Sequence, residues 1–375
     1  MQNPEEELIA ILKKTEVSFT ASLPCEKIKV LLEMVSEQFF HVPLTREEEG
    51  VGICAGAALA GKRPAMFIQS SGIGNMINAL LSLTGFYELP LAIFVSQRGI
   101  YQEKIDAQLP MGKGLPKILR GAGIPHTRIS SAEDFKAISR KLRSVYEKNR
   151  IHAFLLSPAT WEGSSARSTA AFDQRPVVSM IPAKRRDVLP PDSARYGLIA
   201  AIAPYLEGKV VVSNLGWPSK ELYSVKHQSS NFYMLGSMGM ASPIGLGVAL
   251  SSSKDVVVID GDGSLLMNPG VLATAAHFSP DNLSILAIDN SSYGSTGSQK
   301  TLTGSCVDLE LVARGFGIGN TVKVATQEQL KSAITEKKSG LKFIHALALP
   351  GNRDVENIPH NPLTIRDHVM RFLRR

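Results

Sequence analysis

The stretch that decides the fold is DVVVIDGDGSLLMNPG, residues 255–270, an apolar run that ends abruptly at Gly261-Asp262-Gly263. A second apolar run, within AIDNSSYGSTGSQKT at residues 287–301, ends in the same way at Asp289-Asn290. Short apolar runs bounded by turn residues are typical of strands that are buried on both faces. We therefore predict two strands of a parallel sheet, connected through a helix near 268–277.

The polar residues that end these two strands predict a binding site. In a doubly wound sheet, ligands bind beyond the carboxyl ends of the strands, so Asp262 and Asn290 should meet at one edge. A carboxylate oxygen, an amide oxygen and a nearby backbone carbonyl suit Mg²⁺ or Ca²⁺. Asp-Gly and Asp-Asn are also ordinary turn formers, so either pair alone indicates little. Their occurrence together at strand ends favours a metal site.

The rest of the chain repeats the alternation of strands and helices. The apolar runs PAMFIQ and LAIFVS lie in the first half, and KVVVS, LSILAID and KFIHALAL lie in the second. Residues 166–194 contain four prolines and lack a sustained period, which is typical of a linker. The pattern predicts an α/β protein with two doubly wound parallel-sheet domains, at 1–165 and 195–375, and no middle domain.

Composition narrows the class of function. The formal net charge is +7, but the basic residues are dispersed and only 6% of residues are aromatic. This disfavours nucleic acid, while a small anionic substrate fits the charge. No run reaches the roughly 18 apolar residues of a membrane span. The acidic N-terminal stretch does not read as a signal peptide, and three scattered cysteines favour a reduced cytoplasm.

The two strand-end motifs resemble those of the thiamine diphosphate enzymes. In that family an Asp, an Asn about two dozen residues later, and a main-chain carbonyl two residues beyond it hold the divalent ion that anchors the diphosphate. The resemblance implies that Asp262, Asn290 and the carbonyl of Ser292 bind Mg²⁺. The family's usual Asn-Asn pair is Asp289-Asn290 in this chain.

Two further stretches of the second half resemble the cofactor site of this family. SNLGWPSKEL, residues 213–222, follows a strand and opens a helix, so its amides would meet the diphosphate; an ordinary helix start is the alternative. In LGSMGMASPIGLGVAL, residues 235–250, Met238 would bend the cofactor, or would merely pack, and Gly236 would offer its carbonyl to the aminopyrimidine. The residues implied to bind the cofactor in this half are Asn214, Leu215, Gly236, Met238, Gly261, Asp262, Gly263, Ser264 and Asn290.

The first half resembles the part of the family that activates the ring. Thiamine chemistry requires a carboxylate against the pyrimidine nitrogen, and the family supplies a glutamate before a helix of small residues. Within TREEEGVGICAGAALAGKRPAMFIQSSGIGN, alignment on the first glycine implies Glu48, with Glu47 and Glu49 as alternatives. An acidic helix start, favoured by the helix dipole, is the non-catalytic interpretation. The SSGIGN turn would place Gly72 and Asn75 beside the pyrimidine.

Within the family, the absence of a middle domain and of an adjacent His-His pair resembles the two-domain decarboxylases of 3-sulfopyruvate and 3-phosphonopyruvate. The chain is most similar to the sulfopyruvate decarboxylases, with their α and β chains fused in order. The resemblance implies release of sulfoacetaldehyde and CO₂ in coenzyme M biosynthesis of methanogens. It also implies a homodimer or homotetramer with active sites at the subunit interface. The alternatives are a phosphonopyruvate decarboxylase and a Mg-nucleotide-binding regulatory protein, although GxxxxGK[ST] and GxGxxG motifs are absent.

Four residues are candidates for contact with the substrate. Arg98 follows a predicted strand and is the leading candidate for binding the sulfonate; an exposed structural arginine is the alternative. Gln108 and Lys113, in AQLPMGKG, would lie on a loop that closes over the site. Tyr293, just past the metal ligands, would touch the reacting group or merely pack. Among the histidines, only His360 is considered as a proton relay.

Overall fold

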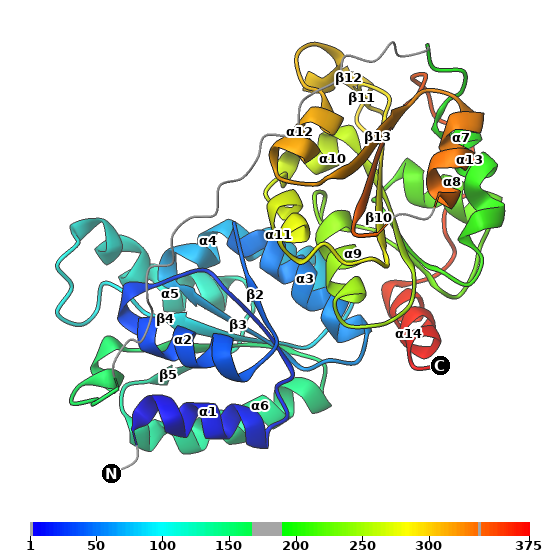
Figure 1. Ribbon diagram of the computed structural model, residues 1–375. Helices are drawn as coiled ribbons and strands as arrows, with labels where there is room; N and C mark the ends of the chain where they lie inside the picture. The colour runs from blue at the N-terminus through cyan, green and yellow to red at the C-terminus, as the bar shows by residue number, and fades with distance from the viewer. Residues whose placement is uncertain (1–2, 167–189, 337–338) are drawn as a thin grey trace. The chain divides into compact units, whose positions relative to one another are not determined.

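The computed structural model describes residues 3–166, 190–336 and 339–375 (Figure 1). The chain divides into two compact units, Met1–Pro176 and Val177–Arg375. Each unit contains one six-stranded sheet whose strands all pair in parallel. The predicted fold class, two doubly wound α/β domains, is confirmed. The predicted linker at 166–194 lies mostly outside the described residues, so the domain boundaries stay predictions.

The sheet of the first unit has the strand order β2-β1-β3-β4-β6-β5. Helices α1, α2 and α6 pack on one face, through alternate residues of the strands such as Phe67, Phe94 and Phe154. These three rings stack, with neighbouring centroids 4.8 and 4.9 Å apart. The bounds are β1 Phe19–Ser22, β2 His41–Pro43, β3 Pro64–Gln69, β4 Leu91–Ser96, β5 His126–Ile129, β6 Ile151–Leu156, α1 Pro4–Lys14, α2 Lys29–Gln38, α3 Glu47–Leu59, α4 Ser70–Ala79, α5 Leu109–Gly121 and α6 Phe135–Glu147.

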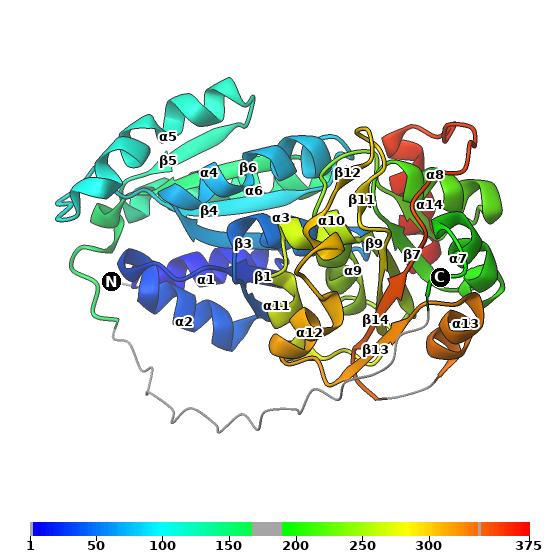
Figure 2. The ribbon, with the colours of Figure 1, turned by 90° about the horizontal axis from the view of Figure 1, so that it is seen from above.

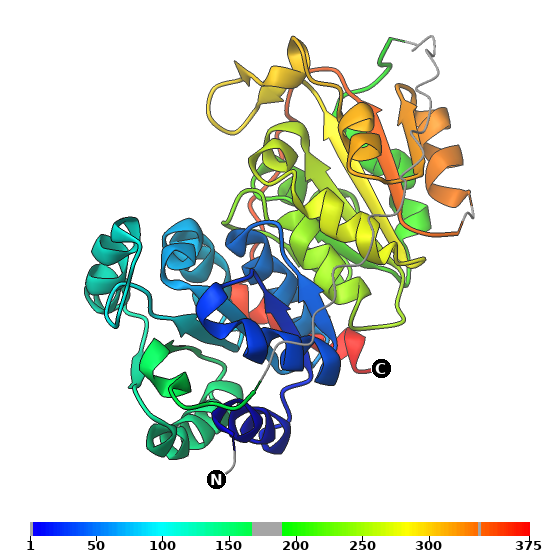
Figure 3. The ribbon, with the colours of Figure 1, turned by 60° about the vertical axis from the view of Figure 1, so that its left-hand side comes forward.

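The sheet of the second unit has the strand order β13-β14-β10-β9-β7-β8. Helices α7, α8 and α13 cover one face, and α9, α11 and α12 cover the other (Figures 2 and 3). The bounds are β7 Val210–Ser213, β8 Asn231–Tyr233, β9 Val256–Gly261, β10 Leu283–Asp289, β13 Asn320–Val324, β14 Lys342–Leu347, α7 Arg195–Ile202, α8 Trp217–Val225, α9 Ala241–Ala249, α10 Asp262–Met267, α11 Val271–Phe278, α12 Leu309–Gly315, α13 Gln327–Thr335 and α14 Pro362–Leu373, with a small hairpin of β11 Ser292–Tyr293 and β12 Gln299–Lys300.

The crossover from β9 to β10 contains the predicted helix and one more. The helix expected near 268–277 is α11, which begins at Val271, and a short helix that was not predicted, α10, begins directly at Asp262. Pro269 and Gly270 separate them: proline lacks the amide hydrogen that a continuous helix needs. The early start of α10 matters for the site, since it puts Asp262 in the first turn of a helix at the end of its strand.

The strand register brings the predicted site residues to one edge of this sheet. Ser213 of β7 pairs with Ile259 of β9, and Gly261 of β9 pairs with Ile288 of β10. The three strands therefore end within a residue or two of one another. No helix in the described part of the chain is long and apolar enough to cross a membrane.

The contact between α9 and β9 provides a test of the packing. A Cβ added at Gly245 would lie 2.1 Å from Cγ2 of the fully buried Val258. Because a β-branched side chain has little freedom to move, we expect Gly245→Ala to lower the free energy of unfolding by about 1–3 kcal/mol. Calorimetric unfolding would measure this change.

The matched control is Gly315→Ala, at the end of α12 in the same unit, where an added Cβ meets no atom within 4 Å. We expect its stability to equal or slightly exceed that of the wild type. Equal stability of the two variants would contradict the packing argument.

Candidate active site

A cavity of about 120 Å³ lies at the carboxyl edge of the second sheet. It is formed by the ends of β9 and β10, the start of α8 and the β11 hairpin. With the exception of Gly236, every residue of this unit that the sequence predicts to bind cofactor lines the cavity. The predicted metal ligand Ser292 and the predicted substrate residue Tyr293 line it too. The predicted residues in the lining are Asn214, Leu215, Met238, Gly261, Asp262, Gly263, Ser264, Asn290, Ser292 and Tyr293.

Asp262 is the buried acid of this cavity, with 4% of its surface exposed. Its Oδ2 accepts hydrogen bonds from Thr301 Oγ1 at 2.5 Å and Thr303 Oγ1 at 3.1 Å. Burial raises the pKa of Asp262, and the neighbouring charge of Asp289 adds to the rise. A bound cation is what would restore the charged form of such a carboxylate.

Asn290 lies on the same wall and is equally buried, with 4% exposed. Its Oδ1 accepts from the amide of Ser292 at 3.2 Å. Its Nδ2 has no hydrogen-bond partner within the described residues. Asp262, Asn290 and Ser292 all line the cavity, and a carboxylate oxygen, an amide oxygen and a carbonyl are the types of ligand that suit Mg²⁺.

Asp289, the other member of the polar pair, does not line the cavity. Its Oδ2 lies 2.8 Å from Nε2 of His345 on β14, and its Oδ1 accepts from Thr303 at 2.8 Å. Burial alone would raise the pKa of Asp289, but these hydrogen bonds hold that pKa below its usual range. Asp289 therefore ties the end of β10 to β14, and Thr303 bridges it to Asp262.

Two tight backbone features shape the cavity. Met238 stands between Ser237 and Gly239, whose φ angles are 60° and 89°, so it projects from a left-handed turn. A Cβ added at Gly263 would lie 2.3 Å from the ring of Tyr293, so only glycine lets that ring pack there. This packing holds the hairpin that carries Tyr293 against the start of α10.

Sequence reasoning missed Arg195, which also lines the cavity. Its guanidinium forms a buried bidentate pair with Glu221 at 2.8 and 3.0 Å and donates to Asn352 Oδ1 at 2.8 Å. Asn352 in turn donates to the carbonyl of Gly294 at 2.9 Å. The network anchors the hairpin to α7 and α8. A lone arginine before an apolar helix carries no motif that would have revealed it.

In the first unit the three glutamates at the start of α3 have different surroundings. Glu49 is fully buried, and its Oε1 accepts from the amide and hydroxyl of Thr45, just before the helix. Glu48 has a side chain 14% exposed, 3.6 Å from Arg46, and burial raises its pKa against the attraction of that arginine. Glu47 accepts from Asn75 at 2.9 Å, and a Cβ added at Gly72 would lie 2.6 Å from its Oε1. The structure thus brings Gly72 and Asn75 to Glu47.

Comparison with known proteins shows which family contains these two groups of site residues, one in each unit. The models of the N-terminal and C-terminal TPP binding domains of thiamine pyrophosphate enzymes match residues 3–117 and 216–346. Sulfopyruvate decarboxylase of Methanosarcina acetivorans is 46% identical over 367 residues, which cover 96% of this chain and 95% of that protein. The chain belongs to the thiamine pyrophosphate enzymes. Thiamine pyrophosphate is the thiamine diphosphate of the sequence analysis, and the chain is a decarboxylase-type member of this family.

Other relatives of this thiamine pyrophosphate enzyme match each half separately. The α and β subunits of sulfopyruvate decarboxylase from Methanocaldococcus jannaschii are 40% and 46% identical, covering 40% and 45% of this chain and 91% and 90% of the subunits. The chain is therefore a fusion of α-like and β-like parts. Phosphonopyruvate decarboxylase of Streptomyces viridochromogenes is 32% identical over 93% of the chain and 89% of that protein.

Among solved structures, benzoylformate decarboxylase from Polynucleobacter necessarius matches with a TM-score of 0.74 at 12% identity. The match covers 95% of this chain and 100% of that chain, and it shows the shared fold. Family membership disfavours the regulatory nucleotide-binding protein considered from the sequence.

Three of the four predicted substrate residues, Arg98, Gln108 and Lys113, follow β4 in the first unit of this thiamine pyrophosphate enzyme. The predicted loop is wrong for Lys113, which lies on helix α5. Arg98 is buried and forms a bidentate pair with Glu103, both distances being 2.7 Å, and the Glu103 side chain is 3% exposed. Gln108 is partly buried, with Oε1 lacking a partner among described residues, whereas Lys113 on α5 is exposed. The charge of Arg98 is thus already balanced within the chain.

This pair predicts a pH dependence of stability. The hydrogen bond from Arg98 lowers the pKa of Glu103 to about 2, below its value in the unfolded chain. A depressed folded pKa means that the stabilisation is complete above the unfolded pKa and is lost as the pH falls toward 2. We expect Glu103→Gln to lower the free energy of unfolding by about 1–3 kcal/mol at pH 7, because it removes the negative charge and one of the two acceptors that face the buried guanidinium.

Urea unfolding of wild type and variant between pH 7 and pH 2.5 would measure this difference, which should shrink below about pH 4. Glu133→Gln, an exposed glutamate in the same unit, is the control and should track the wild type. A Glu103→Gln variant as stable as the wild type at pH 7 would show that the pair contributes nothing.

Proposed function

We propose that this chain decarboxylates 3-sulfopyruvate to sulfoacetaldehyde and CO₂ with thiamine diphosphate and Mg²⁺. The observation that carries the proposal is the 46% identity to a sulfopyruvate decarboxylase along nearly the whole length of both chains. The phosphonopyruvate decarboxylase relative reaches 32%, so phosphonopyruvate is the second candidate substrate. Both acids carry an anionic group on the carbon next to the keto group, which suits the positive net charge of +7.

The cavity of the second unit supports binding of the diphosphate and its ion. Asp262, Asn290 and the carbonyl of Ser292 would hold Mg²⁺, because the two side chains are buried in the cavity wall and all three offer oxygen ligands. The Nδ2 of Asn290, unpartnered within the described chain, is a donor and would face a phosphate oxygen. The backbone at Asn214 and Leu215, and that at Gly261–Ser264, would face the phosphate oxygens. Thiamine diphosphate, when bound, supplies a carbon nucleophile and an electron sink for loss of CO₂.

For the acid that contacts the pyrimidine, the contacts favour Glu47 over Glu48. Glu47 is 3% exposed and touches both Gly72 and Asn75, the residues that the resemblance places beside the ring. Glu48 has its own raised pKa and stays the sequence-based alternative. Oε1 of Glu49 already accepts hydrogen bonds from the amide and hydroxyl of Thr45. The role of the chosen acid is to hold a proton at the ring nitrogen.

The pairing of Arg98 with Glu103 bears on how the sulfonate would be bound. A guanidinium that donates two hydrogen bonds to one carboxylate has fewer donors left for a substrate. Lys113, whose ammonium group is exposed on α5, and the side-chain amide N–H groups of Gln108 would then supply the anion contacts. Tyr293, on the wall of the cavity, would contact the reacting end of the keto acid.

The assembly and setting follow from the same resemblance. Relatives with separate α and β subunits support an active site shared between two polypeptides. We therefore infer a homodimer or homotetramer with active sites at subunit interfaces. The sulfopyruvate decarboxylase relatives come from methanogens, which supports a place in coenzyme M biosynthesis. The cysteines, all free, fit a reduced cytoplasm.

The substrate prediction is tested by following aldehyde release from sulfopyruvate and phosphonopyruvate side by side. We expect sulfoacetaldehyde to form only when both thiamine diphosphate and Mg²⁺ are present, with a kcat/KM at least about 10-fold above that for phosphonopyruvate, since recognition of a matched anion is worth 1.4 kcal/mol or more. Preference for phosphonopyruvate would overturn the substrate and keep the reaction. Binding of the cofactor without turnover of either acid would overturn both.

Paired variants test which glutamate acts at the ring. We expect Glu47→Gln to lower kcat at least about 100-fold while the cofactor still binds, because an amide cannot stabilise the proton at the ring nitrogen. Glu48→Gln, one residue along the same helix turn, should keep kcat within about 3-fold of the wild type, on the scale of a surface charge change. Steady-state turnover and calorimetric cofactor titration measure the two effects. The reverse result would assign the role to Glu48.

A further inference from the structure

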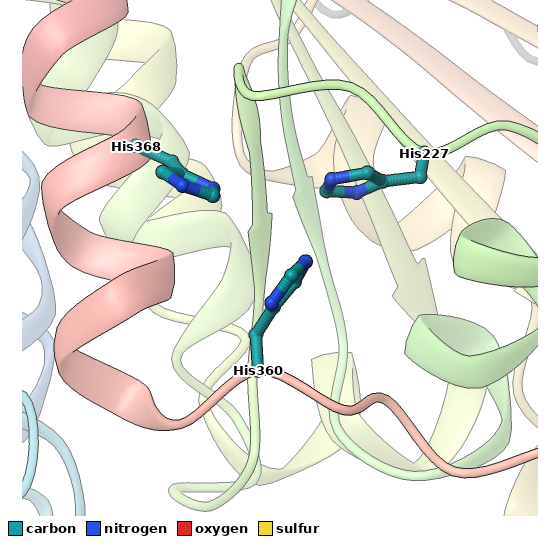
Figure 4. Close-up of side chains that lie close together, drawn as sticks. All are labelled: His227, His360 and His368. Carbon is teal, nitrogen blue, oxygen red and sulfur yellow. The ribbon is translucent and has the colours of Figure 1, made fainter.

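Three histidines of the second unit lie together away from the cavity at the sheet edge (Figure 4). His227 follows α8, His360 precedes α14, and His368 lies within α14. One ring nitrogen from each lies within 4.8 Å of the others. None of the three lines the candidate active site. The cluster therefore requires an explanation of its own.

The geometry is that of an open three-histidine metal site. The ring centroids are 5.0 Å apart for His227 and His360, 5.5 Å for His360 and His368, and 6.5 Å for His227 and His368. Figure 4 shows the three rings around a common space. Tetrahedral Zn²⁺ with bonds of about 2.0–2.1 Å requires nitrogens roughly 3.4 Å apart. The nitrogens lie within 4.8 Å of one another, so the rings would have to move closer together to bind the ion.

The surroundings prepare the rings to act as ligands. His227 Nδ1 lies 3.0 Å from Tyr233 Oη, which also accepts from Asn231 Nδ2 at 2.8 Å. When Nδ1–H donates to this oxygen, Nε2 carries the free lone pair, as in metal sites with an outer hydrogen-bond partner. His360 Nε2 is buried and has no hydrogen-bond partner among the described residues. A metal ion would satisfy this nitrogen.

The electrostatics agree with this geometry. Burial lowers the pKa of His227 and of His368, and repulsion from His360 adds to both shifts. Arg371, on the next turn of α14, also opposes a charge on His368, while Asp367 favours it. Neutral imidazole is the form that binds metals.

We propose that His227, His360 and His368 bind one divalent transition-metal ion, with Zn²⁺ as the best fit. Imidazole nitrogens suit Zn²⁺, Ni²⁺ and Cu²⁺, whereas Mg²⁺ prefers oxygen ligands. The ion would connect α14 to the segment between α8 and β8, residues distant in the sequence. Because such a bond closes a long loop, the ion should stabilise the C-terminal helix against the sheet.

The test uses the full chain, freed of transition metals by a chelator and then supplied with Mg²⁺ and thiamine diphosphate. Zn²⁺ is titrated by calorimetry, and Co²⁺ is added separately because its visible spectrum reports tetrahedral nitrogen coordination. We expect one equivalent of Zn²⁺ per chain, micromolar or tighter affinity, and a higher unfolding temperature in its presence.

Variants separate this site from incidental binding. We expect His360→Ala and His368→Ala each to weaken Zn²⁺ binding at least about 100-fold and to abolish the rise in unfolding temperature. His277→Ala, which removes an exposed histidine of α11, should bind Zn²⁺ like the wild type. If an alanine variant misfolds without metal, His368→Gln keeps a side chain of similar size and serves in its place. Unchanged Zn²⁺ affinity in the folded His360 and His368 variants, or millimolar affinity in the wild type, would overturn the proposal.

Discussion

Parallel pairing of β9 between β7 and β10 is the constraint on which the candidate active site depends. Every strand of the second sheet runs the same way, so the three carboxyl ends meet at one edge. A shift of register by one residue would turn the side chains of β10 to the opposite face and separate Asn290 from Asp262. The apolar residues within these strands fix the register. The site is formed by the polar residues at the strand ends.

The two neighbouring polar residues at the end of β10, Asp289 and Asn290, have different contacts. Asn290 lines the cavity, whereas Asp289 bonds His345 on the adjacent strand β14. His345 Nδ1 lies 3.6 Å from Asp308, and Asp308 pairs with Lys323 on β13. The buried carboxylate thus sits in a chain of alternating charge that leads out to the sheet edge. This explains how an acid replaces the asparagine that the family usually has here.

Those features of the fold and of the cavity that depend on short stretches of sequence could be predicted. Apolar runs that end in glycine and acid predicted the parallel sheets, and spacing predicted the convergence of Asp262 and Asn290. The sequence could not separate Glu47 from Glu48, because that depends on where α4 places Asn75. Nor could it show that Glu103 neutralises Arg98, since the pair forms inside an irregular segment without periodicity. The position of the Arg195 side chain at the cavity depends on its hydrogen bonds to Glu221 and Asn352, which are distant in the sequence.

The chemistry of the ligand atoms distinguishes the two ion sites that we propose in the second unit. At the sheet edge the donors are a carboxylate, an amide and a carbonyl, all hard oxygens that suit Mg²⁺. Beside α14 the donors are imidazole nitrogens, with no carboxylate in the cluster of His227, His360 and His368. Mg²⁺ gains little from such nitrogens. Zn²⁺ bound by Asp262 and Asn290 would compete with the ion proposed to anchor the diphosphate. If the three histidines bind Zn²⁺ more tightly, they would keep it away from that cavity.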